Sequence, residues 1–289
     1  MRTLKAILWA VLAVTLGAFG ALWVPRFGSE PRSSGLGTDL APEVSRAPSA
    51  EAALARLRRR LGSHDVDNGG VGAAERHESI RESIREVGSP GNRNAVPILV
   101  EVYDSRSDAA LRQEVLQALE RIGDETAVRA LVTIARSDQD GASQATVRLS
   151  RVSHRLAGPT LVEVVEEEGR TGTLAAAAVG ALGKTRLRQN VPLLVALARG
   201  PRSTQVRLAA ARALGLIGDP AGVAALGELL AEATASLRRQ AIRSLGTIRS
   251  AQSLKHLEDF LRTRPEGLER ELAVEAVAAL QGESRSPRP

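Results

Sequence analysis

Apolar residues recur at helical spacing through most of this chain. Between residues 203 and 231, Val206, Ala210, Leu214 and Ile217 lie three or four positions apart, which places them on one stripe of a helix. Gly218 follows directly, and glycine readily takes the left-handed conformation that ends a helix. The pattern predicts an amphipathic helix that stops at this glycine.

A second helix is expected immediately afterwards. Asp219 suits the N-cap position and Pro220 suits the first helical position. An apolar stripe of its own then follows, at Leu226, Leu229 and Leu230. A lone pair of such helices cannot bury both stripes, so each pair must stack against neighbouring pairs.

The two-helix pattern is repeated along the chain. Segments 111–135, 206–230 and 237–261 align with one another, and fainter copies lie between and around them. The alignment places one residue of each copy at the turn between its helices: Gly123, Gly218 and Arg249 in the clear copies, and Gly88, Gly158, Gly183 and Gly282 in the fainter ones. Successive turns are 35, 35, 25, 35, 31 and 33 residues apart, a period typical of a solenoid. The 25-residue interval predicts a short second helix in the third copy and a local change of curvature.

The fold class predicted from this repeat is all-α, an α-solenoid over residues 75–282. Six stacked helix pairs are expected, with a last helix at about 266–281 that caps the stack and a disordered tail at 283–289. A tether rich in Pro, Gly and Ser is expected at 25–74, with a short helix at 51–61. The six pairs span 75–103, 108–136, 141–168, 171–199, 203–231 and 235–263.

The repeat resembles the short HEAT-like repeat of the phycobilisome-lyase type. The resemblance covers about residues 75–282 and implies stacked helix pairs. It implies little about function, because such repeats serve many roles. The residues that match the pattern V-R-x-x-A-x-x-A-L-G-x-I-G-D-P-x-x-x-x-x-L-x-x-L-L are Val206, Arg207, Ala210, Ala213, Leu214, Gly215, Ile217, Gly218, Asp219, Pro220, Leu226, Leu229 and Leu230.

The first 24 residues predict a membrane segment. Met1 to Lys5 is short and basic, and the 19 residues from Ala6 to Val24 carry no charge. As a helix this run is roughly 28 Å long, close to the ~30 Å core of a bilayer. The basic start stays in the cytoplasm, so a single-pass anchor in a bacterial inner membrane would place the body in the periplasm. The alternative is a signal peptide cleaved after Gly20, which would release the body into the periplasm.

Composition excludes several classes of fold and site. Aromatic residues make up 2% of the chain, and only Tyr103 and Phe260 lie beyond residue 27, which argues against a β-sandwich or barrel. Cysteine is absent, which excludes disulfides, thiolate metal sites and cysteine nucleophiles. Because interface hot spots favour Trp, Tyr and Arg, a strong contact made by this body is expected to depend on arginine.

Positive charge is concentrated in one part of the body. Residues 170–250 carry 12 basic and three acidic side chains, whereas residues 61–169 carry 12 basic and 19 acidic ones. The basic residues are 36 Arg and three Lys, a bias that indicates a GC-rich genome rather than nucleic-acid binding. The aromatic residues that stack on single strands are also missing. An acidic protein partner is therefore expected, and a nucleic acid is not.

Arginines of this basic segment are the candidate partner-binding residues. Arg207 and Arg238 share a repeat position with Arg112, where the resemblance implies a tie to acids in an adjacent loop. Arg212 and Arg243 share a second repeat position, at which the repeat pattern specifies no residue type. We call arginines that share a repeat position a ladder. In this family the second helix of each repeat usually lines the concave face of the solenoid. A basic surface formed by the first helix of each repeat is therefore expected on the convex face or at an edge. The candidate set is Arg207, Arg212, Arg238, Arg239 and Arg243.

The function predicted from these observations is a non-catalytic protein-interaction scaffold with no cofactor and no metal. The sequence leaves the oligomeric state open. A repeat-fold enzyme of bilin-lyase or hydroxylase type is one alternative. The resemblance implies several His-Glu pairs for a hydroxylase iron site, whereas this chain has His77-Glu78 alone, and no H-E-x-x-H, phosphate loop or nucleophile elbow. A binder of anionic lipid or nucleic acid through the basic repeats is the other alternative.

Overall fold

The structure, a computed structural model, describes residues 50–62, 72–105, 108–138, 140–168, 172–232, 234–263 and 265–282. Within these ranges it contains fourteen α-helices, α2 to α15, and no strand, which confirms the predicted all-α repeat fold. The predicted membrane segment at 1–24 and the predicted tail at 283–289 lie outside the described residues. No helix in the described part of the chain is long and apolar enough to cross a membrane.

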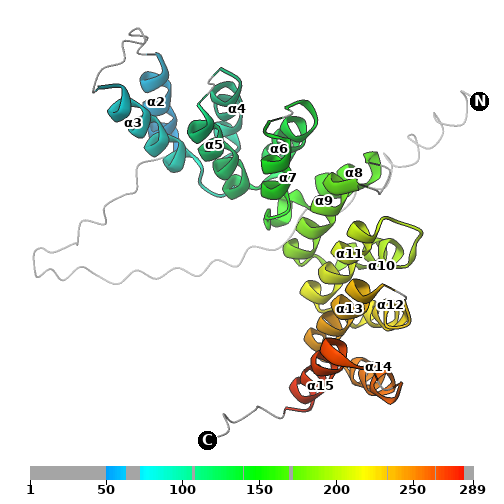
Figure 1. Cartoon of the computed structure of the whole chain (residues 1–289). Helices are drawn as coiled ribbons and strands as arrows, with labels where there is room; N and C mark the ends of the chain where they lie inside the picture. Colours follow the sequence, from blue (N-terminus) through cyan, green and yellow to red (C-terminus); the bar gives the residue numbers. More distant parts are fainter. Residues whose placement is uncertain are drawn as a thin grey trace, which may run out of the picture. The chain divides into compact units, whose positions relative to one another are not determined.

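The helices of the body alternate between two layers (Figure 1). The even layer contains α2 (Ala50–Gly62), α4 (Val96–Ser105), α6 (Glu125–Ser137), α8 (Gly158–Glu167), α10 (Val191–Arg199), α12 (Val223–Leu229) and α14 (Ala251–Arg262). The odd layer contains α3 (Gly72–Val87), α5 (Ala109–Ile122), α7 (Ala142–Leu149), α9 (Gly172–Thr185), α11 (Thr204–Ile217), α13 (Ala235–Thr247) and α15 (Gly267–Gln281). Each odd helix packs on the next odd helix and on a helix of the even layer.

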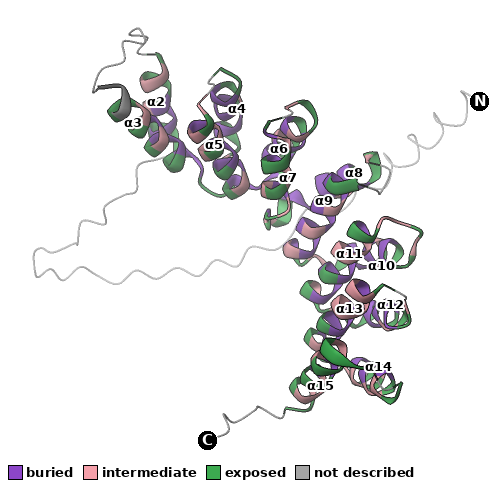
Figure 2. Cartoon of the chain, viewed as in Figure 1, coloured by how far each residue is buried: buried purple, intermediate pink, exposed green. Residues whose placement is uncertain are grey.

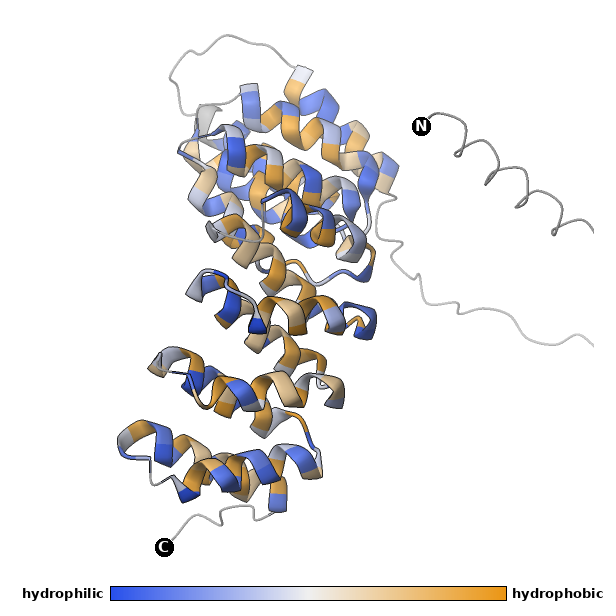
Figure 3. Cartoon of the chain, turned by 90° about the vertical axis from the view of Figure 1, so that its right-hand side faces the viewer, coloured by the Kyte–Doolittle hydropathy of each residue, from blue (hydrophilic) through white to orange (hydrophobic). Residues whose placement is uncertain are grey.

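The core lies between the two layers. Buried positions gather where the layers face each other, and exposed positions lie on the outside (Figure 2). Each helix is therefore apolar on one side and polar on the other (Figure 3). Leu116, Leu182 and Leu194 are completely buried in this core. Burial of one such side chain contributes about 1.5–3 kcal/mol, so stability is spread along the stack.

The Gly-Asp turns form as the sequence predicts. Gly123 and Gly218 end α5 and α11 in the left-handed conformation, with φ of 58° and 73°. Asp124 then accepts a hydrogen bond from the backbone N–H of Ala127, and Asp219 caps the 3-10 segment before α12 in the same way. These turns reverse the chain between an odd helix and the following even helix.

Two of the glycines assigned to turns lie elsewhere. Gly158 begins α8, because Pro159 fits the first turn of a helix. Gly183 lies inside α9, and the chain turns at Arg186, whose φ is 53°. The prediction of a short second helix in the third copy is therefore wrong. The short helix is the first one of that copy, α7, with eight residues, and α8 has ten.

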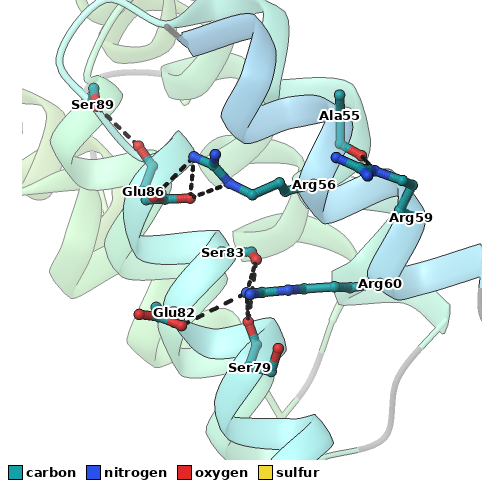
Figure 4. Close-up of polar contacts among 9 residues, drawn as sticks. All are labelled: Ala55, Arg56, Arg59, Arg60, Ser79, Glu82, Ser83, Glu86 and Ser89. Carbon is teal, nitrogen blue, oxygen red and sulfur yellow. Dashed lines mark hydrogen bonds and ion pairs between the residues drawn. The ribbon is translucent and has the colours of Figure 1, made fainter. Parts of the chain in front are cut away.

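The helix predicted at 51–61 is present as α2, but it is part of the stack and not of a tether. Its buried face packs on α3. On the polar side, Arg56 forms an ion pair with Glu86, and the Arg60 guanidinium donates to the Ser79 carbonyl and to the Ser83 hydroxyl (Figure 4). Sequence reasoning missed this because α2 has no partner helix within its own repeat.

Neighbouring odd helices approach each other closely at glycine residues. A Cβ atom at Gly183 of α9 would lie 2.5 Å from the Ala213 Cα of α11. A Cβ at Gly215 of α11 would lie 2.9 Å from the Ser244 Cα of α13. Because small residues meet at these contacts, the helices pack without large side chains between them. This explains why the body contains so few aromatic residues.

The stack bends between α8 and α10. These two even helices do not pack closely on each other, whereas α9 and α11 of the odd layer pack tightly. The even helices are thus separated at this point, whereas the odd helices remain in contact. The odd layer therefore lies on the concave side of the bend (Figure 1). The predicted change of curvature is present, one repeat later than the shortened helix.

Candidate protein-binding face

Arg207 and Arg238 hold neighbouring repeats together. The Arg207 Nε donates to the Ala198 carbonyl at 2.9 Å, and its Nη2 donates to Glu232 Oε1. This hydrogen bond holds the pKa of Glu232 below its ordinary value. Arg238 donates from Nε and Nη2 to the two carboxylate oxygens of Glu269, each at 2.9 Å. The two-point contact of Arg238 is strong and directional. Both arginines therefore join elements of the stack, and their charges are already paired with carboxylates.

Arg112 occupies the same repeat position and has a similar role. Its Nε donates to the Tyr103 carbonyl, and its guanidinium lies 5.1 Å from the centre of the Tyr103 ring. The Tyr103 hydroxyl donates to Asp138 at 2.5 Å. Burial, and then this hydrogen bond, raise the pKa of the Tyr103 phenol above its ordinary value. The chain's single tyrosine is therefore part of the core and not of an interface.

Arg212 and Arg243 are placed differently from the other candidates. Both side chains are exposed, on α11 and α13, and neither makes a hydrogen bond or ion pair within the described residues. Arg239 is half-buried, and its Nε donates to the Ala235 carbonyl of its own helix. Of the five predicted residues, Arg212 and Arg243 are thus the two whose charge is available to a partner.

Two further cations, which the sequence did not single out, lie beside this ladder. Lys184 is at the end of α9, and Arg151 follows α7. Partial burial, and next the positive charge of Arg212, hold the pKa of the Lys184 ammonium below its ordinary value; the Glu120 carboxylate opposes this shift, and Arg151 adds to it. We call Arg151, Lys184, Arg212 and Arg243 the basic face. The sequence signal for the basic face is the regular spacing of cations on successive odd helices.

The basic face lies on the outer side of the odd layer. The even helices cover one side of each odd helix, and the neighbouring odd helices cover two more, so the exposed stripe points away from the even layer. At the bend, this outer side of the odd layer faces the concave side of the stack. The family pattern predicts the convex side or an edge instead. Gly180 of α9 lies in this stripe, with open space beyond its Cα.

A shallow hollow continues the basic face toward the N-terminal repeats. It is formed entirely by α5, α7 and the turn after α7. Its exposed apolar side chain is Val147, which is 49% exposed. A partner segment lying along the odd layer would thus meet cations at one end and neutral polar groups at the other. The lining residues are Gln113, Ser143, Gln144, Val147, Arg148 and Arg151.

The histidine and acidic residues have structural contacts of their own. His77 Nδ1 lies 2.8 Å from Asp108 Oδ2, and Asp108 caps α5. Glu167 and Glu168 at the end of α8 pair with Arg136 of α6. No group of three or more His, Asp or Glu side chains in the described ranges could hold a metal ion.

The same substitution is expected to have a large effect on stability in one arginine ladder and almost none in the other. We expect Arg238→Gln to lower the free energy of unfolding by about 1–2 kcal/mol, because it leaves the half-buried Glu269 carboxylate without its two-point partner. Arg243→Gln is expected to change it by less than about 0.5 kcal/mol, because the side chain is exposed and unpaired. Urea unfolding of the two variants measures both values. Equal losses in the two variants would contradict this distinction.

Comparison with known proteins identifies the repeat. Residues 74–151, 158–242 and 191–278 match the pattern of HEAT repeats. No curated protein matches the chain.

Several solved structures are similar to the chain. One is the complex of CpcE and CpcF of phycocyanin lyase from Nostoc sp., with 19% identity over 86% of this chain and 100% of that chain and a TM-score of 0.36. Another is an engineered protein, with 20% identity over 78% of this chain and 67% of that chain and a TM-score of 0.37. A third is a designed armadillo repeat protein in complex with the peptide (KR)4, with 15% identity over 78% and 98% and a TM-score of 0.36.

Proposed function

Because the chain belongs to the HEAT-repeat family, we propose that it is a non-catalytic scaffold whose basic face captures an acidic segment of a partner protein. One observation carries this proposal. The four cations of the basic face lie on the successive odd helices α9, α11 and α13 and in the turn after α7, and they form no ion pair within the described residues. Many other arginines of the body are paired with carboxylates, as Arg129 is with Glu163 and Arg199 is with Glu228.

The electrostatics favour an anionic partner. Burial is the largest cause of the lowered pKa of Lys184, and repulsion by the like charge of Arg212 on the adjacent helix adds to it. An acidic segment laid across α9, α11 and α13 would relieve this repulsion and would be attracted from a distance. Three of the four cations lie within residues 170–250, which contain only three acids for 12 basic residues.

We also propose that residues 1–24 tether this scaffold to the inner membrane, with the body in the periplasm. The support is the uncharged 19-residue run after a basic start. A tether of this kind would hold the basic face near partners at the membrane surface and raise their effective concentration.

Crosslinked capture from membranes tests the proposed function. The full chain is compared with the Lys184→Glu/Arg212→Glu/Arg243→Glu variant and with a control that reverses three exposed cations elsewhere, Arg58→Glu/Lys255→Glu/Arg270→Glu. Both variants change the net charge equally. We expect the first to reduce capture of an acidic protein at least tenfold, and the control to leave it within about twofold.

Three outcomes would contradict the proposal. Equal capture by both variants would show that net charge and not the basic face matters. Salt-dependent binding of anionic vesicles or duplex DNA, with capture of protein unaffected, would favour a lipid or nucleic-acid binder. A chromophore or metal that copurifies with the chain would favour a repeat-fold enzyme.

A further inference from the structure

A second group of unpaired cations lies at the edge where the odd helices end. It lines a hollow of about 470 Å³ between the turn after α3, the end of α5 and the turn after α7. The lining residues are Pro90, Glu120, Arg121, Ser153, His154 and Arg155. Two turns and the end of one helix thus meet at this hollow, and its polar side chains come from α5 and from the turn after α7.

This hollow is cationic, in a part of the chain that is acidic overall. Residues 61–169 contain 19 acids for 12 basic residues, and Arg85, Arg129 and Arg136 there are all ion-paired. Arg121 and Arg155, in contrast, make no ion pair or hydrogen bond within the described residues. Neither guanidinium group has a carboxylate partner, although this part of the chain is rich in carboxylates. Both positive charges are therefore available to an external anion.

The remaining polar groups of the hollow are also donors or are already paired. The Glu120 carboxylate accepts from Arg148 Nη1 at 3.0 Å, so its charge is compensated. His154 Nδ1 accepts from the backbone N–H of Leu156, which leaves Nε2 of the neutral ring as an N–H donor. The Ser153 hydroxyl has no partner within the described residues.

We propose that this hollow binds an oxyanion of the phosphate class. Two guanidinium forks, one imidazole N–H and one hydroxyl offer more donors than the two oxygens of a carboxylate can use. A phosphate group has enough oxygens to accept from all four side chains, and arginine is the side chain best matched to it. The ligand is inorganic phosphate or a phosphate monoester.

Histidine NMR of the full chain gives a site-resolved test. The chain has four histidines, and His154→Gln assigns the signal of interest. We expect inorganic phosphate, added at constant ionic strength, to shift the His154 imidazole signal saturably while the His77 and His256 signals stay in place. Arg121→Gln/Arg155→Gln is expected to weaken this binding at least tenfold, and Arg270→Gln, an exposed arginine of α15, to leave it unchanged.

The arms of the titration distinguish the ligands. O-Phosphoserine that binds more tightly than inorganic phosphate supports a monoester ligand, and the reverse order supports the free ion. Acetate is expected to bind at least tenfold more weakly. Equal binding of acetate, an unmoved His154 signal, equal shifts of all the histidines, or full binding by the double variant would each overturn the proposal. None of these readouts involves the basic face, so this test and that of the proposed function fail separately.

Discussion

Gly183→Ala is expected to lower the free energy of unfolding by about 1–3 kcal/mol, although alanine is the better helix former. The added Cβ would lie 2.5 Å from the Ala213 Cα and 2.6 Å from its Cβ, so α9 and α11 would have to move apart. Forcing a methyl group into a packed interface typically costs more than the roughly 1 kcal/mol gained in helix propensity. For a body of this size the melting temperature should fall by about 2–4 °C for each kcal/mol.

Gly180 of the same helix provides the matched control. A Cβ at Gly180 would meet nothing within 4 Å, and its backbone is helical. Gly180→Ala should therefore raise the free energy of unfolding by about 0.5–1 kcal/mol. Thermal or urea unfolding of both variants measures the sign of each change in the free energy of unfolding. A stabilising effect of alanine at position 183 would show that the odd helices are not in close contact.

Leu57→Ala is expected to release α2 from the stack. The Leu57 side chain is completely buried between α2 and α3, and loss of such a side chain costs about 2–5 kcal/mol. Because each repeat contacts only its neighbours, the loss should be local. Amide hydrogen exchange should become faster in residues 50–62, and α9 to α13 should keep their protection.

The control for this prediction is Arg58→Ala, at an exposed position on the same helix. It should leave the exchange of α2 unchanged. Exchange that becomes faster throughout the body in Leu57→Ala would contradict the picture of a stack with nearest-neighbour contacts. Exchange of α2 that is already fast in the unmodified chain would show that this helix does not pack on α3.

Local signals predict much of this fold. The Gly-Asp turn at Gly218 and Asp219 fixes both the end of α11 and the start of the next segment, because one residue takes the left-handed conformation and the other caps. Such signals fail where a glycine has another role. The repeat alignment assigns Gly183 to a turn, but this glycine lies inside α9, where α11 approaches closely. That contact is between repeats, and no local pattern encodes it.

The binding surfaces could be predicted only in part. Arg212 and Arg243 are visible in the sequence as a ladder, but their separation from Arg207 and Arg238 depends on which carboxylates the stack brings within reach. The side of the bend on which they lie depends on how closely α9 packs on α11. The anion hollow joins two turns and the end of a helix from three successive repeats, so no single segment contains its signature.

Site-specific photo-crosslinking tests the central claim most directly. A photoreactive residue replaces Gly180, which lies in the basic face with open space before it, or Glu101, an exposed residue of α4 in the even layer. The account predicts a crosslink to an acidic protein from position 180, none from position 101, and loss of the first in the Lys184→Glu/Arg212→Glu/Arg243→Glu background. Crosslinking from position 101 alone, or from position 180 regardless of the charge reversal, would contradict it.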